Sequence, residues 1–257
     1  MSELVLYETH DNVAVITLNR ADAMNAFNRP MRQALGAAQQ KAEHDESIRV
    51  VMLTGTGNCF SSGTDLKEAL GQSEIYDISV TEYKPLIDHI ENSKKTYLAA
   101  INGVTGGVAL GMAMACDLTT MSDQATMFSP FSNISFVPDG GTTWYFLNYL
   151  GRKKAFEAIA ECTHLDAKTC MELGMINKIF PNDELKDQTL EWAKSIAKRA
   201  PLTLMYTKRL LKSAATTDRE SIAHQESEYQ NRCIRSEDAK SAVQAFFSKQ
   251  KPVFKGK

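Results

Sequence analysis

The apolar run Tyr97-Leu-Ala-Ala-Ile101 leads directly into the glycine-rich stretch Asn102-Gly-Val-Thr-Gly-Gly-Val-Ala-Leu-Gly-Met112. The run predicts a buried strand, and the small residues after it predict a turn that opens a helix. Glycine at such a turn permits a close approach of a ligand, or it lets the helix pack closely on a sheet. The glycine spacing differs from G-x-G-x-x-G, so the stretch gives little support to a dinucleotide site.

Three other segments, 13–18, 50–54 and 116–121, are predicted to be strands of the same sheet because they are rich in apolar and β-branched residues. Between the first two, Asn28 is placed to cap a helix that runs to about Glu43. Strands separated by helical segments favour parallel pairing through crossovers. The first part of the chain is therefore predicted to be an α/β core.

The pattern becomes almost entirely helical from about Trp144 onward. Helices are predicted over 152–161, 166–173, 184–199, 201–214, 218–232 and 235–248. Pro201 stands where a helix can begin, and Gly174 follows a predicted helix as its C-cap. We predict two regions, an α/β core over residues 1–195 and a helical region over residues 196–257.

Composition narrows the class of protein. Of the 257 residues, 43% are hydrophobic and 23% are charged, as is usual for a globular protein. The net charge is -2, so the composition does not predict a positively charged surface for nucleic acid or a membrane. No apolar run has the length of a membrane span, and the first residues lack the features of a signal peptide, so we expect a soluble, cytoplasmic protein. Five dispersed cysteines predict reduced thiols, and the five histidines show no metal-ligand spacing.

Two other stretches combine a turn with groups that can do chemistry. In Cys59-Phe-Ser-Ser-Gly-Thr-Asp-Leu-Lys67 a helix start near Thr64 or Asp65 exposes backbone N–H groups that can bind an anion or an oxyanion. In Phe136-Val-Pro-Asp-Gly-Gly-Thr-Thr-Trp144 a turn carries Asp139. Taken singly, both are more often ordinary turns in which the aspartate serves as a cap.

Asp139 is set apart by the aromatic residues near it in sequence. These are Phe128, Phe131, Phe136, Trp144 and Tyr145. A carboxylate among such groups would lose hydration, and its pKa would rise. The same aromatic residues are equally consistent with an ordinary core.

In this order and spacing the three turns resemble the enoyl-CoA hydratase/isomerase (crotonase) superfamily, and the resemblance covers nearly the whole chain. The matching segments are Ile16-Thr-Leu-Asn-Arg20, Met24-Asn-Ala26, Phe60-Ser-Ser-Gly-Thr-Asp-Leu66, Ala99-Ala-Ile-Asn-Gly103, Cys116-Asp117, Pro138-Asp-Gly-Gly-Thr142, Ala167 through Gly174-Met-Ile, and Ala245-Phe-Phe. The resemblance implies an α/β spiral of β-β-α turns with a C-terminal helical region for trimerisation. It also implies an acyl-CoA thioester substrate, a homotrimer or dimer of trimers, and no separate cofactor, because coenzyme A is part of the substrate.

The resemblance also implies roles for individual residues. Carried over by position, the backbone N–H groups of Thr64 and Val108 would form an oxyanion hole. Removing a proton next to a thioester carbonyl places negative charge on its oxygen, and two preorganised donors would stabilise that charge. The part that wraps coenzyme A would be formed by Met24, Ser62, Thr64, Asp65, Leu66 and Lys67.

Departures from the family pattern indicate the reaction. Hydratases of the family activate water with two glutamates, and at those positions this chain has Gly111 and Phe131. Isomerases of the family instead use an acidic residue after the proline of the last motif, and here that residue is Asp139. The resemblance therefore implies a Δ3,Δ2-enoyl-CoA isomerase in which Asp139 alone moves a proton from C2 to C4. The acyl pocket is expected to include Phe131, Phe136 and Trp144, within a cavity lined from 70–95 and 128–149.

Several alternatives stay open. The Pro-Asp-Gly-Gly-Thr motif is most similar to the isomerase of phenylacetate breakdown, whereas Phe128-Ser-Pro-Phe-Ser132 is similar to isomerases of fatty-acid β-oxidation. A 4-chlorobenzoyl-CoA dehalogenase-like hydrolase would use Asp139 as its nucleophile. That enzyme would need a tryptophan where this chain has Phe131 and a histidine where it has Lys84. A non-catalytic CoA-thioester-binding homologue would also suit the loss of both glutamates.

Overall fold

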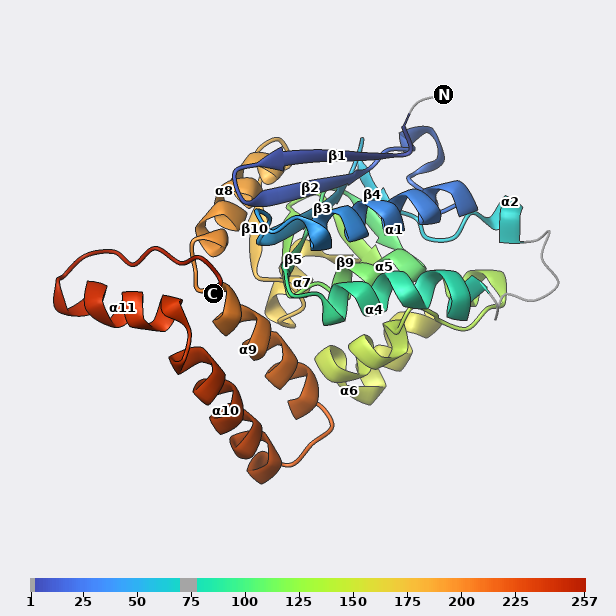
Figure 1. Ribbon diagram of the computed structural model, residues 1–257. Coiled ribbons are helices and arrows are strands. Elements are labelled where there is room, and N and C mark those ends of the chain that lie inside the picture. The colour runs from blue at the N-terminus through green and yellow to red at the C-terminus, as the bar shows by residue number, and fades with distance from the viewer. Residues whose placement is uncertain (1–2, 70–77) are drawn as a thin grey trace.

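A six-stranded sheet runs through the core in the order β1-β2-β3-β5-β7-β10 (Figure 1). The structure is a computed structural model that describes residues 3–69 and 78–257. The strands of this sheet are β1 (Val5–His10), β2 (Val13–Leu18), β3 (Val50–Gly55), β5 (Thr96–Ile101), β7 (Leu118–Ser122) and β10 (Lys178–Phe180). From β2 to β10 neighbouring strands are parallel, which confirms the predicted crossovers, and only the unpredicted β1 pairs antiparallel among these described strands.

A second sheet of four strands has the order β4-β6-β8-β9. Its strands are β4 (Cys59–Ser61), β6 (Val104–Gly106), β8 (Thr126–Phe128) and β9 (Leu165–Asp166). Each of β4, β6 and β8 follows a strand of the large sheet after a few residues and is followed by a helix. This repeat confirms the predicted α/β spiral of β-β-α turns, and it places the ends of β4 and β6 side by side.

Helices cover both faces of the large sheet. They are η1 (Ala21–Ala23), α1 (Arg29–His44), α2 (Leu66–Ala69), η2 (Ser79–Tyr83), α4 (Lys84–Asn92), α5 (Val108–Met114), η3 (Phe131–Ile134), α6 (Thr142–Ala160), α7 (Ala167–Glu172) and α8 (Leu185–Ala197). Asn28 caps α1 as predicted, because its Oδ1 accepts the N–H of Met31 at 3.0 Å. Gly151, at a φ of 71°, breaks α6, so the helix predicted from residue 152 is its second half.

Every residue of β2 is buried, because the strand packs on both of its faces. On one face Ala14, Ile16 and Leu18 belong to the main core, together with residues of α1, α4 and α5. On the other face Val13 and Val15 join a smaller cluster with α8. This double burial explains why the strand reads as a continuous apolar run without alternation.

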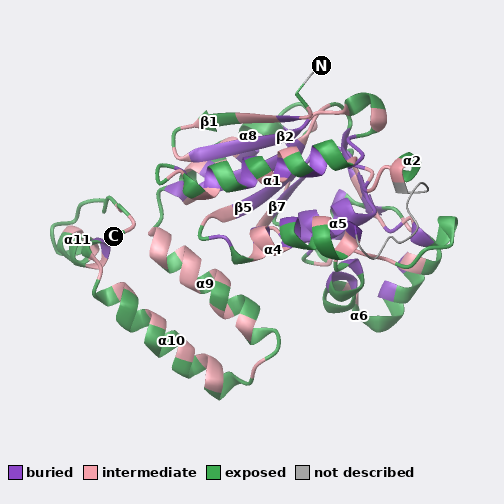
Figure 2. Cartoon of the chain, turned by 45° about the vertical axis from the view of Figure 1, so that its right-hand side comes forward, coloured by how far each residue is buried: buried purple, intermediate pink, exposed green. Residues whose placement is uncertain are grey.

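Three helices form an arm that projects from the core (Figures 1 and 2). They are α9 (Pro201–Ala214), α10 (Arg219–Ile234) and α11 (Glu237–Phe247). No residue of α9 or α10 is buried. The arm exposes large apolar side chains, namely Leu211, Ile234, Val243, Phe246 and Phe247. The predicted boundary at residues 195/196 falls in the last turn of α8 and stays a prediction.

The arm is fastened to the core by two lysines of α9. The Nζ of Lys208 lies 2.9 Å from Asp117 Oδ2 and also donates to the carbonyl of Ile90. The Nζ of Lys212 lies 3.0 Å from Glu91 Oε2. Over the described ranges, no helix combines the length and apolar character that a membrane crossing requires.

Candidate active site

The two turns that were predicted to supply an oxyanion hole lie against each other. One follows β4 and the other follows β6, which is its parallel neighbour. Gly63 has a φ of 95° and Gly107 a φ of 59°, in the left-handed region that favours glycine. A Cβ atom on Gly63 would lie 2.9 Å from the carbonyl oxygen of Gly106 and 3.2 Å from the nitrogen of Val108. Glycine at this contact is therefore what allows the turns to meet.

The two predicted donors adjoin this contact. Val108 is the first residue of α5, so its N–H has no partner within the helix. Thr64 is held by its bridge to Phe27, whose N–H donates to the carbonyl of Gly63 at 2.8 Å and whose carbonyl accepts the N–H of Asp65 at 3.1 Å. These bonds flank Thr64 and turn its own N–H away from Phe27, as alternation along a strand requires.

Asp139 lies on a loop that packs on the start of α5. The next residue is Gly140, at which a Cβ atom would lie 3.1 Å from the Val108 carbonyl oxygen and 2.9 Å from its Cγ2. The Oδ1 atom of Asp139 is buried and has no hydrogen-bond partner among the described residues. The N-cap of α6 is Gly141, without a side-chain cap, so the alternative in which Asp139 caps this helix is wrong.

Burial raises the pKa of Asp139 to about 6, in the direction that the sequence predicted. A carboxyl group with this pKa is largely ionised at neutral pH but takes up a proton readily. That property suits a group that removes a proton and returns it. The structure therefore places a carboxylate with a raised pKa on the loop that packs against Val108, one of the two predicted donors.

Gly111 has a structural reason to be glycine. A Cβ atom at this position would lie 1.9 Å from the carbonyl oxygen of Gly140, far inside any real contact. The loop that carries Asp139 therefore occupies the space that a side chain at residue 111 would need. This backbone contact excludes a glutamate there while the loop keeps its position.

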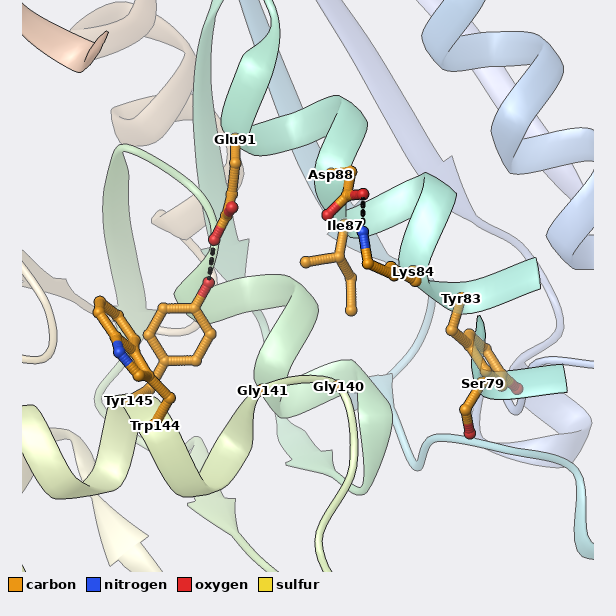
Figure 3. A pocket seen from close by; sticks show the side chains of 10 residues that line it. All are labelled: Ser79, Tyr83, Lys84, Ile87, Asp88, Glu91, Gly140, Gly141, Trp144 and Tyr145. Carbon is orange, nitrogen blue, oxygen red and sulfur yellow. Dashed lines mark hydrogen bonds and ion pairs between the residues drawn. The ribbon is translucent and has the colours of Figure 1, made fainter. Parts of the chain in front are cut away.

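A cavity of about 290 Å³ adjoins the Asp139 loop, between α4 and the start of α6 (Figure 3). Its described lining residues are Ser79, Tyr83, Lys84, Ile87, Asp88, Glu91, Gly140, Gly141, Trp144 and Tyr145. At one end the hydroxyl of Tyr145 donates to Glu91 Oε1 at 2.8 Å. Lys84 and Asp88 pair with each other on the α4 side. Residues 70–77, part of the predicted lining, lie outside the described residues.

Tyr83 stands at the other end of this cavity and is almost completely buried. Burial, and to a smaller extent the nearby charge of Asp139, raises the pKa of Tyr83 to about 12. The Tyr83 hydroxyl therefore stays protonated and neutral. It lies at the end of the cavity where the charge of Asp139 is felt by a lining residue, since the two groups interact electrostatically.

The three residues predicted to line the acyl pocket do not all line the same cavity in the structure. Trp144 lines the cavity and is 50% exposed. Phe131 is buried in η3 and Phe136 is 38% exposed, and neither is among the described lining residues. Of the three, the structure therefore brings only Trp144 to this cavity, and Asp139 itself is not among the described lining residues, although Gly140 and Gly141 of its loop are.

The residues predicted to bind coenzyme A surround the Thr64 turn. Met24, in the left-handed region with a φ of 51°, accepts the N–H of Ser62 at 3.0 Å and has an exposed side chain. Leu66 and Lys67 are exposed as well. Asp65 pairs with Arg20 at 2.6 Å, and this pairing lowers the pKa of Asp65. The Asp65 carboxylate therefore forms an ion pair with a residue of its own chain.

Sequence reasoning missed three residues around the site, namely Arg32, Tyr83 and Glu91. Arg32 has one weak signal, because helical spacing places it on the same face as the buried Leu35 and Gln39. Tyr83 and Glu91 carry no local pattern. Their positions depend on how α4 and η2 pack against distant loops.

Comparison with known proteins agrees with this architecture. The family model for Enoyl-CoA hydratase/isomerase matches residues 8–257. The chain is 30% identical to 1,2-epoxyphenylacetyl-CoA isomerase and 26% identical to 2,3-dehydroadipyl-CoA hydratase, both of Escherichia coli (strain K12), with 100% of each protein covered. A solved structure of an enoyl-CoA hydratase subunit I from Geobacillus kaustophilus HTA426 has a TM-score of 0.93 and 28% identity, and covers 99% of each chain. The chain belongs to the enoyl-CoA hydratase/isomerase family.

Proposed function

We propose that this protein is an enoyl-CoA isomerase that moves a double bond from C3–C4 to C2–C3, with Asp139 as its acid/base group. The observation that carries the proposal is the Oδ1 atom of Asp139, which is buried and lacks a described partner. The adjacent Gly140 touches Val108. A thioester oxygen bound by the N–H groups of Thr64 and Val108 would therefore have its C2 close to this carboxylate.

The proposed reaction needs one carboxylate and two backbone donors. Asp139 takes a proton from C2, and the electron pair moves into the thioester to form an enolate. The N–H groups of Thr64 and Val108 stabilise the charge on its oxygen. The proton then returns at C4, and one carboxylate suffices because C2 and C4 belong to the same allylic system. Coenzyme A enters as part of the substrate, and the proton transfer requires no other cofactor.

The other reactions fit the site less well. Hydration through paired glutamates is disfavoured, because the Gly140 carbonyl fills the space beside Gly111. The dehalogenase mechanism needs a histidine, and neither the described cavity lining nor the segment 70–77 contains one. Lys84, at the position of that histidine, is paired with Asp88.

A spectroscopic screen tests the proposal. The protein is incubated with linear and ring-derived 3-enoyl-CoA thioesters, and with 2-enoyl-CoA thioesters in a separate series. We expect ultraviolet absorbance to rise with the 3-enoyl substrates, as the double bond comes into conjugation with the thioester. Loss of absorbance with 2-enoyl substrates would show hydration instead, and binding without any turnover would favour the non-catalytic alternative.

The pKa of Asp139 predicts a pH dependence. The carboxylate must be ionised to act as a base, so kcat/KM for a 3-enoyl-CoA is expected to rise with pH through about 6 and then to level off. The measurement is a pH–rate profile of the free enzyme between pH 4.5 and 8. A profile that is flat across this range would exclude Asp139 as the titrating base.

Tyr145 is expected to limit the length of the acyl group. With Glu91 and Trp144 it lines both the cavity and a groove of about 810 Å³ between the core and α9, so the Tyr145 ring stands between the two spaces. Tyr145→Ala is expected to raise kcat/KM for long relative to short acyl chains by about tenfold. Tyr149→Ala, an exposed change on the same helix, is the control, and an unchanged chain-length profile in Tyr145→Ala would refute the assignment.

The arm supports the further proposal of a homotrimer or a dimer of trimers. Of its described helix residues only Asp238 is buried, and the arm presents exposed apolar residues such as Leu211, Phe246 and Phe247. Contact with other copies would cover these surfaces. A cytoplasmic location and a place in fatty-acid or aromatic breakdown remain expectations from the sequence.

A further inference from the structure

Arg32 of α1 is a buried cation that holds three separate segments. Its side chain is 3% exposed. Its Nη2 lies 2.6 Å from Glu68 Oε1 in α2, and its Nε lies 2.7 Å from Glu82 Oε2 in η2. Its Nη1 donates to the carbonyl of Phe27 at 3.1 Å. One planar guanidinium group therefore uses all three of its nitrogens on partners in different elements.

The Phe27 carbonyl that receives this bond is the one that fixes the Thr64 turn. It also accepts the N–H of Asp65, while the N–H of Phe27 donates to the carbonyl of Gly63. The peptide groups on both sides of Thr64 are thus tied to one residue, and Arg32 donates to the same carbonyl oxygen of that residue that accepts the Asp65 N–H. The direction of the Thr64 N–H depends on this arrangement.

The other two partners of the Arg32 guanidinium, Glu68 and Glu82, lie close in the chain to Thr64 and to Tyr83. Glu68 follows Thr64 closely in the chain, and its carboxylate also accepts the backbone N–H of Arg29 at 2.7 Å. Glu82 directly precedes Tyr83, which lines the cavity, and the Arg32 guanidinium carbon lies 5.2 Å from the centre of the Tyr83 ring. The turn that carries Thr64 and the Tyr83 end of the cavity are therefore both held by Arg32.

We propose that Arg32 is a positioning residue for the oxyanion hole, which sets the direction of the Thr64 N–H and thereby the polarisation of the bound thioester carbonyl. This inference rests on the proposed function, because it takes the Thr64 N–H as a donor to the substrate. Lysine is a poor substitute, since a single ammonium group cannot reproduce the fork that reaches Phe27, Glu68 and Glu82 at once.

The test measures carbonyl polarisation separately from turnover. A non-reactive acyl-CoA with a 13C-labelled thioester carbonyl is bound to each variant, and the shift of its C=O stretch is recorded by difference infrared spectroscopy. Arg32→Lys and Arg32→Met are expected to lose at least half of the wild-type shift. We expect kcat to fall by about 10–10²-fold with KM within threefold, because a misdirected donor weakens transition-state stabilisation more than ground-state binding.

Two further variants separate positioning from stability. Arg32→Met combined with Glu82→Gln reduces the unpaired charge that the single change leaves, and it is expected to recover folding but not the carbonyl shift. Arg29→Met removes an exposed cation 3.7 Å from the same Glu82 and should keep both the shift and kcat. A folded Arg32→Met/Glu82→Gln protein with the full wild-type shift would overturn the inference.

Asp139→Asn distinguishes this inference from the proposed function. That variant should lose turnover but retain the carbonyl shift, because the oxyanion donors are intact. A wild-type protein that fails to isomerise any 3-enoyl-CoA, yet shows an Arg32-dependent shift, would refute the isomerase proposal and support the positioning role. A wild-type protein without any shift would refute the positioning role.

Discussion

Asp139→Asn is expected to lower kcat for a 3-enoyl-CoA by about 10²–10⁴-fold, which is the usual contribution of a positioned acid/base group. Asparagine has nearly the same shape but cannot accept the C2 proton. The backbone donors at Thr64 and Val108 are untouched, so KM should change little. Steady-state kinetics, followed by the absorbance of the conjugated product, provide the measurement.

The same variant is expected to be more stable than the wild-type protein at neutral pH. The folded-state pKa of about 6 lies above the ordinary value of 3.8, so ionisation of Asp139 opposes folding. This cost is absent below pH 4, grows between pH 4 and 6, and is complete above pH 6. Removing it should raise the free energy of unfolding by about 1–3 kcal/mol at pH 7, and the gain should vanish below pH 4.

Asp183→Asn serves as the control for both measurements, because Asp183 is exposed and far along the chain from the site. It should leave kcat and the unfolding curve unchanged. Near wild-type turnover in a folded Asp139→Asn protein would remove Asp139 from the mechanism. A variant with low turnover but no gain in stability would instead show that burial does not disfavour its charge.

Gly111→Ala is expected to reduce turnover by about 10²-fold or more and to destabilise the protein. The added Cβ would overlap the Gly140 carbonyl, so either α5 or the loop must shift. Overpacking of this kind costs about 1–3 kcal/mol, and a displacement of about 1 Å at the catalytic loop can account for the loss of rate. Chemical denaturation and kinetics with a 3-enoyl-CoA measure the two effects.

Gly36→Ala is the matched control. Gly36 is also within a helix, but a Cβ atom there would meet the Cδ2 atom of Leu86 at 3.3 Å, a contact that a side-chain shift of a few tenths of an ångström relieves. This change should be neutral or slightly stabilising, since alanine favours helix over glycine. Gly111→Glu should not create a hydratase, and wild-type stability and turnover in Gly111→Ala would contradict the packing argument.

Much of the fold was predictable because its signals are local. The apolar runs of β2, β3 and β5 and the Asn28 cap of α1 are visible in a few consecutive residues. The strands β6 and β8 were not predicted individually, because three residues are too few to show a period. β1 has mostly exposed or half-buried residues, so its sequence lacks the apolar run of its neighbours.

The site was predictable in its backbone turns but not in its surroundings. Gly63 and Gly107 could be located because left-handed turns select glycine strongly. The raised pKa of Asp139 was predicted from its aromatic neighbours in sequence, yet Phe136 is substantially exposed in the structure. The contact between Gly111 and the Gly140 carbonyl and the bonds of Arg32 to Glu68 and Glu82 join segments far apart in sequence, so no local pattern predicts them.

Glu91 divides its two carboxylate oxygens between the cavity and the arm. One oxygen accepts the hydroxyl of Tyr145, and the other pairs with Lys212 of α9. A ligand that displaced Tyr145 would leave Glu91 paired with Lys212 alone, and a shift of α9 would move the acceptor of the Tyr145 hydroxyl. Thermodynamic linkage would make such an effect reciprocal: if other copies bound the arm, their effect on acyl binding and the effect of the acyl group on their binding would be the same coupling free energy.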